Sequence, residues 1–273
     1  MKKKRLTAVS AFHFFRLFYR SLLLISALIW YIQRWTKDLD ASVLHMEAGS
    51  GKFILILIWF IFMAEMCLRF FPSRLESPGC QKQFRQNYRP TGRTDVELHD
   101  NSAVMIVALI WVVLNLIPGT LYLQGVLDEG VLVLLSLTYS VCDMICILFF
   151  CPFQTWFLRN RCCSSCRIYN WDYAMMFTPL FFIGGLFSWT LLAAAIALLF
   201  RWEITVWQYP ERFSENTNQY LNCANCTEKL CSHKKQLITF RRALAAFAEA
   251  KVRRILGGGE LLQTVKNRKT NPQ

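Results

Sequence analysis

Charged residues are scarce in this 273-residue sequence: Asp, Glu, Lys and Arg make up 18% of it, whereas hydrophobic residues make up 54%. A soluble domain usually contains about 25% charged residues. A soluble core can absorb part of such an apolar excess, but it does not accommodate uninterrupted apolar runs of about twenty residues, the length that crosses a bilayer. The shortage of charge therefore excludes an ordinary soluble domain and predicts a membrane protein.

The sequence also lacks the short motifs of several large enzyme classes. It contains no P-loop, G-x-G-x-x-G, G-x-S-x-G or H-E-x-x-H pattern. His13, His45 and His99 are isolated in the sequence, and no internal repeat is present. These absences argue against a common hydrolase or a nucleotide-driven pump, and we expect no catalytic residues.

The alternating pattern of a transmembrane β-barrel is missing, whereas five apolar segments are present. We therefore expect an all-α, polytopic integral membrane bundle. Arg20 interrupts the first segment, whose uncharged part needs the arginine to snorkel in order to reach across. Pro179 and the pair Gly184-Gly185 allow a re-entrant hairpin in the fifth segment, but hydropathy favours a straight helix there. The five segments cover residues 17–33, 53–71, 103–123, 130–151 and 175–200.

The positive charges give the expected orientation. With the N-terminus in the cytoplasm, fifteen Lys and Arg residues of the connections lie inside and three lie outside. A net charge of +13 also suggests nucleic acid as a partner, but no nucleic-acid-binding motif accompanies it, so we assign the charge to the membrane. Five spans would leave residues 201–273 outside, although this tail is itself strongly basic.

The tail contains one strong helical pattern. Apolar residues recur at near-helical spacing over residues 234–256, and basic residues occupy much of the remaining surface. Such a basic amphipathic helix is typical of an element that lies on anionic lipid, or of one that docks on a membrane or cytoplasmic protein partner or on the protein's own loops. The predicted lipid-binding residues are Lys234, Lys235, Arg241, Arg242, Arg253 and Arg254.

Two cysteine groups indicate a possible metal site. C-x-x-C spacing lets two thiolates reach one ion, and thiolates favour zinc or an iron–sulfur cluster. Cys163 with Cys166 and Cys223 with Cys226 form two such pairs, so we predict a shared four-ligand site, with Cys162, Cys231 and His233 as secondary ligands. The alternatives are free thiols or a redox dithiol. A shared site requires the tail to lie on the cytoplasmic side together with Cys163.

Two acidic residues lie within the apolar segments, at similar expected depths. Asp143 is in the fourth segment and Glu65 is in the second. A carboxylate at such a depth is energetically unfavourable, and it indicates a path for an ion, a proton or a substrate. Glu65 has Arg69 four residues later as a possible partner, whereas Asp143 has only Tyr139 at that spacing. Asp172 is expected to pair with one of the neighbouring arginines.

Three functions remain open from the sequence. The first is a membrane protein with a cytoplasmic zinc or iron–sulfur site, acting as a structural hub, an electron-transfer element or an accessory subunit. The second is a small ion- or proton-coupled transporter or channel that uses Asp143, with Glu65 as a second candidate residue. The third is a non-catalytic membrane scaffold that binds anionic lipid or a protein partner.

Overall fold

The computed structural model describes residues 8–36, 50–72, 78–98, 101–158 and 166–222. All of these residues belong to the first of two compact units, Met1–Lys229, and the second unit is Leu230–Gln273. The predicted amphipathic helix 234–256 with its lipid-binding residues lies outside the described residues. So do six of the seven predicted metal ligands: Cys162, Cys163, Cys223, Cys226, Cys231 and His233.

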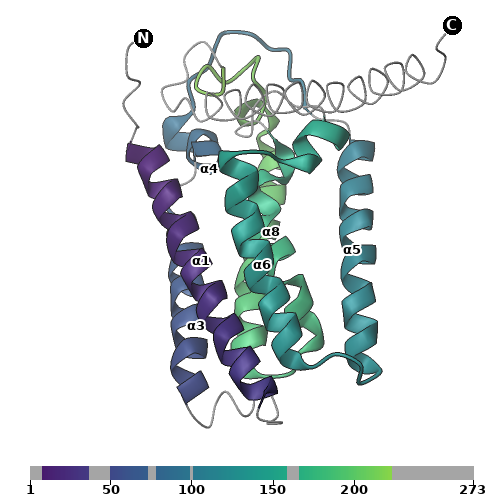
Figure 1. Cartoon of the computed structure of the whole chain (residues 1–273). Coiled ribbons are helices and arrows are strands. Elements are labelled where there is room, and N and C mark those ends of the chain that lie inside the picture. Colours follow the sequence, from purple (N-terminus) through teal and green to yellow (C-terminus); the bar gives the residue numbers. More distant parts are fainter. Residues whose placement is uncertain (1–7, 37–49, 73–77, 99–100, 159–165, 223–273) are drawn as a thin grey trace, which may run out of the picture. The chain divides into compact units, whose positions relative to one another are not determined.

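The described part of the chain is helical and forms a bundle (Figure 1). Four of its helices are long and apolar enough to cross a membrane, as expected for an integral membrane protein. These are α1 (Ala8–Trp35), α5 (Asn101–Leu123), α6 (Glu129–Leu148) and α8 (Leu186–Gln208). Shorter elements complete the bundle: α4 (Pro78–Gln83), η1 (Arg85–Asn87), η2 (Phe153–Phe157), η4 (Arg167–Trp171), α7 (Asp172–Phe177), η5 (Thr178–Phe182) and η6 (Pro210–Arg212).

Helix α3 (Ser50–Arg69) corresponds to the second predicted segment but is not among the four membrane-spanning candidates. It contains Lys52, Glu65 and Arg69 along its otherwise apolar length. Glu65 and Arg69 are both buried in the bundle. Lys52 is exposed near the start of the helix, whereas Glu65 and Arg69 are directed inward, toward other helices.

Helix α1 begins well before the predicted start at residue 17, and its buried face is partly polar. His13, Arg16 and Arg20 recur on that face at spacings of three and four residues, so they form one stripe along the helix. The prediction that Arg20 snorkels out of the membrane is wrong, because its side chain is fully buried and paired inside the bundle. Hydropathy alone cannot distinguish these two environments of an arginine.

Helices α1 and α6 run in opposite directions, and contacts at both ends show this. At one end the Tyr31 hydroxyl donates to Asp128 Oδ2 (3.0 Å), and Asp128 also caps α6 by accepting from the Val131 N–H (2.9 Å). At the other end the rings of Phe14 and Phe149 lie 6.1 Å apart. The short turn at 124–128 then joins α6 to α5 at the lower end of the bundle (Figure 1).

The expectation of one straight helix over residues 175–200 is wrong. The chain passes down the bundle through α7 and η5, turns at residues 183–185, and returns in α8. Pro179 provides no N–H for a continuing helix, and Gly185 has φ +133°, a conformation that side chains with a Cβ rarely adopt. These two features break the helix where hydropathy is uniformly high.

Because of this break, α7, η5 and α8 form a hairpin, and α8 ends at the same end of the bundle at which α7 begins. Glu203 on α8 accepts hydrogen bonds from Arg167 (2.8 Å) and from the Trp171 indole (2.6 Å). The following residues meet the connection after α3: the Thr91 N–H donates to Thr217 O (3.1 Å), and the Gln219 N–H donates to Arg89 O (2.8 Å). Residues 209–222 and 84–98 therefore lie at the same end of the bundle.

The interior between these helices is closely packed and largely apolar. Phe62 on α3 meets Phe177 on α7 edge to face, with ring centroids 5.3 Å apart. Met66, Leu132 and Ile183 are fully buried in the same cluster. This core fixes α3, α6 and α7 relative to one another, and these are the helices that hold the carboxylates described next.

Candidate functional site

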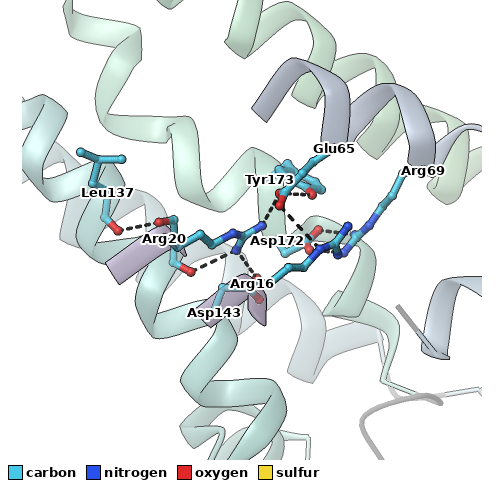
Figure 2. A network of polar contacts seen from close by, with 9 residues as sticks. Arg16, Arg20, Glu65, Arg69, Leu137, Asp143, Asp172 and Tyr173 are labelled. Atoms are coloured by element: carbon cyan, nitrogen blue, oxygen red, sulfur yellow. Dashed lines mark hydrogen bonds and ion pairs between the residues drawn. The ribbon is translucent and has the colours of Figure 1, made fainter. Parts of the chain in front are cut away.

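A network of charged side chains crosses the interior of the bundle (Figure 2). Its residues come from four helices that are far apart in the sequence. They are Arg16 and Arg20 on α1, Glu65 and Arg69 on α3, Asp143 on α6, and Asp172 and Tyr173 on α7. Helical spacing of four residues places Arg16 with Arg20, and Glu65 with Arg69, on single faces of their helices. Three arginines thus meet three carboxylates.

Arg20 occupies the centre of this network. Its Nη2 donates to Glu65 Oε2 (2.5 Å), and its Nη1 donates to Asp143 Oδ2 (3.1 Å) and to the Ser140 carbonyl oxygen (3.0 Å). The guanidinium also lies over the ring of Phe62, 5.4 Å from its centroid. A buried arginine is tolerated only when its charge is matched and its donors are bonded. Arg20 therefore joins three helices through one side chain.

Arg69 holds the neighbouring part of the network. Its two terminal nitrogens contact both oxygens of Asp172, at 2.7 and 2.6 Å, in the bidentate geometry that arginine favours. Asp172 therefore pairs with a distant arginine, and the prediction of a partner near it in the sequence is wrong. Arg167, the nearby arginine in the described part of the chain, bonds to Glu203 instead.

Tyr173 connects the two halves of the network. Its hydroxyl donates to Glu65 Oε2 (2.8 Å), the same oxygen that accepts from Arg20. Its ring lies 4.8 Å from the Arg69 guanidinium and 5.9 Å from that of Arg20, within the range of a cation–π contact. Glu65 also lies 3.5 Å from Arg16 Nε. The Glu65 carboxylate is thus held from several directions and is buried.

Asp143 differs from the other two carboxylates in the network. Its side chain keeps 17% exposure, whereas those of Glu65 and Asp172 keep 8% and 6%. Its Oδ2 accepts from Arg20, and among the described residues no hydrogen bond reaches its Oδ1. The exposed part of Asp143 contributes to the wall of a pocket. Of the network's carboxylates, Asp143 is therefore the most exposed, and it lies at the wall of this pocket.

The pocket has a volume of about 280 Å³ and lies between α5, α6, α7, η2 and η4. Four aromatic residues line it: Trp111, Tyr139, Phe153 and Tyr169. The Trp111 ring lies 4.7 Å from that of Tyr139 and 6.1 Å from that of Phe153. Asp143 and Asp172 supply carboxylates to an otherwise largely apolar wall. This combination of an apolar cavity with a few polar groups is typical of small-molecule sites.

Four cysteines also line the pocket: Cys142, Cys146, Cys151 and Cys166. Cys166 is the one predicted metal ligand that the structure describes, and its side chain is buried. Within the described ranges, no group of three or more His, Cys, Asp or Glu residues has an arrangement that could hold a metal ion. The predicted four-ligand site thus has one member in the described structure and three outside it.

The structure brings together the two intramembrane acids predicted from the sequence. Glu65 and Asp143 share Arg20 as a partner. Sequence reasoning did not identify Arg16, Arg20, Arg69 and Tyr173 as members of a site. The sequence did contain a signal for two of them. Arg16 and Arg20 lie one helical turn apart at the edge of an apolar run, and their positive charge could compensate the intramembrane acids.

No family model matches the chain, and no curated protein or solved structure matches it either. The class of protein is therefore defined only by its fold and its site. It is an all-helical protein with four candidate membrane-spanning helices and a buried network of charged residues.

Proposed function

We propose that the protein is a small membrane transporter that binds its cargo, a proton or another cation, at Asp143. One observation carries this proposal: the Asp143 carboxylate bonds to the buried Arg20 through one oxygen and contributes to the pocket wall with its remaining exposed surface. Ionisable groups at membrane depth are energetically unfavourable and mark ion, proton or substrate pathways.

The network gives Asp143 a means of exchanging partners. Arg20 remains bonded to Glu65 at 2.5 Å, so its charge stays compensated when Asp143 is neutralised by a proton or engaged by a cation. Each such event weakens the bond between α1 and α6 that runs through Arg20 and Asp143 (3.1 Å). Cargo binding thereby acts on the packing of two helices, which is the coupling that a transporter requires.

Substitution of Asp143 in reconstituted vesicles tests this function. The purified protein is inserted into liposomes containing a pH-sensitive dye, and proton flux is followed after a potassium diffusion potential is imposed. We expect Asp143→Asn to lower the flux at least about tenfold, the equivalent of about 1.4 kcal/mol. Asp95→Asn makes the same chemical change on an exposed loop and should leave the flux unchanged. Equal flux in wild-type and Asp143→Asn vesicles would reject the proposal.

A cysteine-ligated zinc ion or iron–sulfur cluster is a second candidate function, and the path of the chain favours it. Because Glu203 bonds to Arg167 at 2.8 Å, α8 returns to the end of the bundle at which the residue after Cys166 lies. Asn222, which precedes Cys223, bonds through its N–H to Gln219 O at that same end (3.3 Å). Arg167 and Asn222, the described residues next to Cys166 and Cys223 in the sequence, therefore lie at the same end of the bundle.

Elemental analysis of anaerobically purified protein tests the metal. We expect zinc, or iron with sulfide, in a fixed ratio to protein, and a loss of metal in Cys226→Ser. Cys67→Ser removes an exposed cysteine of α3 and serves as the matched control. Metal-free protein in which every thiol reacts with a labelling reagent would reject this candidate.

A labelling experiment tests the path of the chain itself. Single cysteines introduced in a cysteine-free background at Asn222 and at Gln124 should react with a membrane-impermeant reagent from opposite sides of a vesicle. Gln124 follows the last residue of α5, whereas Asn101 at the start of α5 bonds to Arg167, at the end of the bundle where Asn222 lies. Reaction of both positions from one side would show that the hairpin α7–η5–α8 does not return the chain.

A further inference from the structure

We infer that the cargo of this pocket is a small organic cation with an apolar body, such as a quaternary ammonium compound. This inference rests on the proposed function and specifies its substrate class. It combines three properties of the pocket: the sign of its charged groups, its aromatic wall and the ligands that it lacks.

The charged groups that face the pocket are acidic. Asp143 and Asp172 line it, whereas the arginines that compensate them lie behind this wall, bonded to carboxylates of the network. Of the two acids, Asp172 uses both oxygens for Arg69. Asp143 keeps Oδ1 without a hydrogen bond among the described residues, so an incoming cation can approach it while Oδ2 stays on Arg20. An anionic ligand would meet carboxylates instead of guanidinium groups.

The aromatic wall lies beside this carboxylate. Tyr139 is four residues before Asp143 on α6, so its ring and the carboxylate project from one face of the helix. The ring of Trp111 packs against Tyr139 at 4.7 Å, and that of Phe153 lies 6.1 Å from Trp111. Aromatic rings and a carboxylate that line one pocket attract quaternary ammonium groups, most strongly where water is excluded.

An inorganic divalent cation fits the pocket less well. Calcium requires about six to eight oxygen ligands, and magnesium requires a complete octahedral shell. In the described ranges no group of three or more potential metal ligands converges, although four thiols and two carboxylates line the pocket. Most of the wall is apolar carbon, which favours a ligand whose own surface is mainly apolar.

The size of the pocket limits the cation. A cavity of about 150 Å³ holds a benzene molecule. At about 280 Å³ the pocket has room for one aromatic ring with a compact ammonium group attached. Phenyltrimethylammonium meets this description. Its neutral isostere tert-butylbenzene has the same shape without the charge, so the pair separates recognition of the cation from simple filling of an apolar space.

The test measures binding of both compounds to the full-length protein in detergent by isothermal titration calorimetry. We expect saturable binding of phenyltrimethylammonium and at least about tenfold weaker binding of tert-butylbenzene. Asp143→Asn should weaken binding of the cation at least about tenfold, and Trp111→Leu about threefold to tenfold. Asp95→Asn, on an exposed loop, should leave it unchanged.

Equal affinity of the wild-type protein for the two compounds would overturn the inference. This comparison uses no variant, so it does not depend on whether a variant folds. Equal affinity of wild type and Asp143→Asn for the cation would overturn it as well. If the cation fails to bind while proton flux still depends on Asp143, the substrate class is wrong and the transporter stands. If the cation binds through Asp143 but no flux of any cation occurs, the substrate class stands and transport is wrong.

Discussion

Replacement of Arg20 by methionine tests whether the buried network holds the helices together. Methionine and arginine have similar helix propensities and lengths, so the change removes the charge with little effect on α1 itself. It deletes ion pairs to Glu65 (2.5 Å) and Asp143 (3.1 Å) and a hydrogen bond to Ser140 O (3.0 Å), all at a side chain with no exposure. Removing one partner of a buried ion pair lowers the free energy of unfolding by about 3–5 kcal/mol.

We expect a loss near the lower end of this range. Glu65 keeps the Tyr173 hydroxyl at 2.8 Å and Arg16 at 3.5 Å, so it is not left without partners. The remaining loss comes mainly from Asp143, whose hydrogen bond from Arg20 has no replacement among the described residues. About 3 kcal/mol is therefore the expected decrease in the free energy of unfolding.

The assay is equilibrium unfolding in mixed micelles of dodecyl maltoside and sodium dodecyl sulfate, followed by tryptophan fluorescence. Arg93→Met, on an exposed part of the 84–98 connection, is the matched control and should change stability by less than about 0.5 kcal/mol. A double-mutant cycle of Arg20→Met with Glu65→Gln should give a coupling energy of about 1–3 kcal/mol. A role of Arg20 in holding the helices together is refuted if Arg20→Met unfolds like the control, or if the two substitutions add without coupling.

Three other substitutions test separate parts of the structure in the same unfolding assay. Arg69→Lys should lower the free energy of unfolding by about 1–2 kcal/mol, because one ammonium group cannot reproduce the bidentate contact with Asp172; no change would contradict that geometry. Gly119→Ala should lower it by about 1–3 kcal/mol, because a Cβ at that position overlaps the ring of Phe182, and Phe182→Leu should restore part of the loss. Gly185→Ala should lower it by about 1–3 kcal/mol, because its φ of +133° is strained for alanine although the space around it is open; an effect no larger than that of alanine at the preceding glycine would contradict this account of the turn.

Much of the fold could be predicted from the sequence because lipid imposes a simple rule. Every backbone N–H and C=O group in a bilayer must be bonded internally, so a long apolar segment forms a helix. Helices α1, α5 and α6 therefore lie over three of the predicted segments. The rule fails in the fifth segment because hydropathy averages over the break at residues 183–185, whose cause is the backbone chemistry of Pro179 and Gly185.

The candidate site was predictable in part. The unfavourable transfer of charge into lipid identified Glu65 and Asp143 without any structural information. It could not identify their partners, since Arg20 is 45 residues from Glu65 and 123 residues from Asp143 in the chain. Pairing at such separations depends on how α1 packs against α3 and α6. The pocket beside Asp143 depends in the same way on the packing of α5 and α7.

Composition and apolar length alone predicted a helical bundle with helices long and apolar enough to cross a membrane, because the requirement to bond the backbone in lipid leaves few other choices. A charged residue in an apolar run is energetically unfavourable, but the sequence does not show which residue compensates its charge. Only the tertiary structure decided that Arg20 lies between Glu65 and Asp143, that Arg69 takes Asp172, and that α8 returns to the end at which the hairpin began. Local periodicity gives the face of a helix, and packing then determines which faces meet.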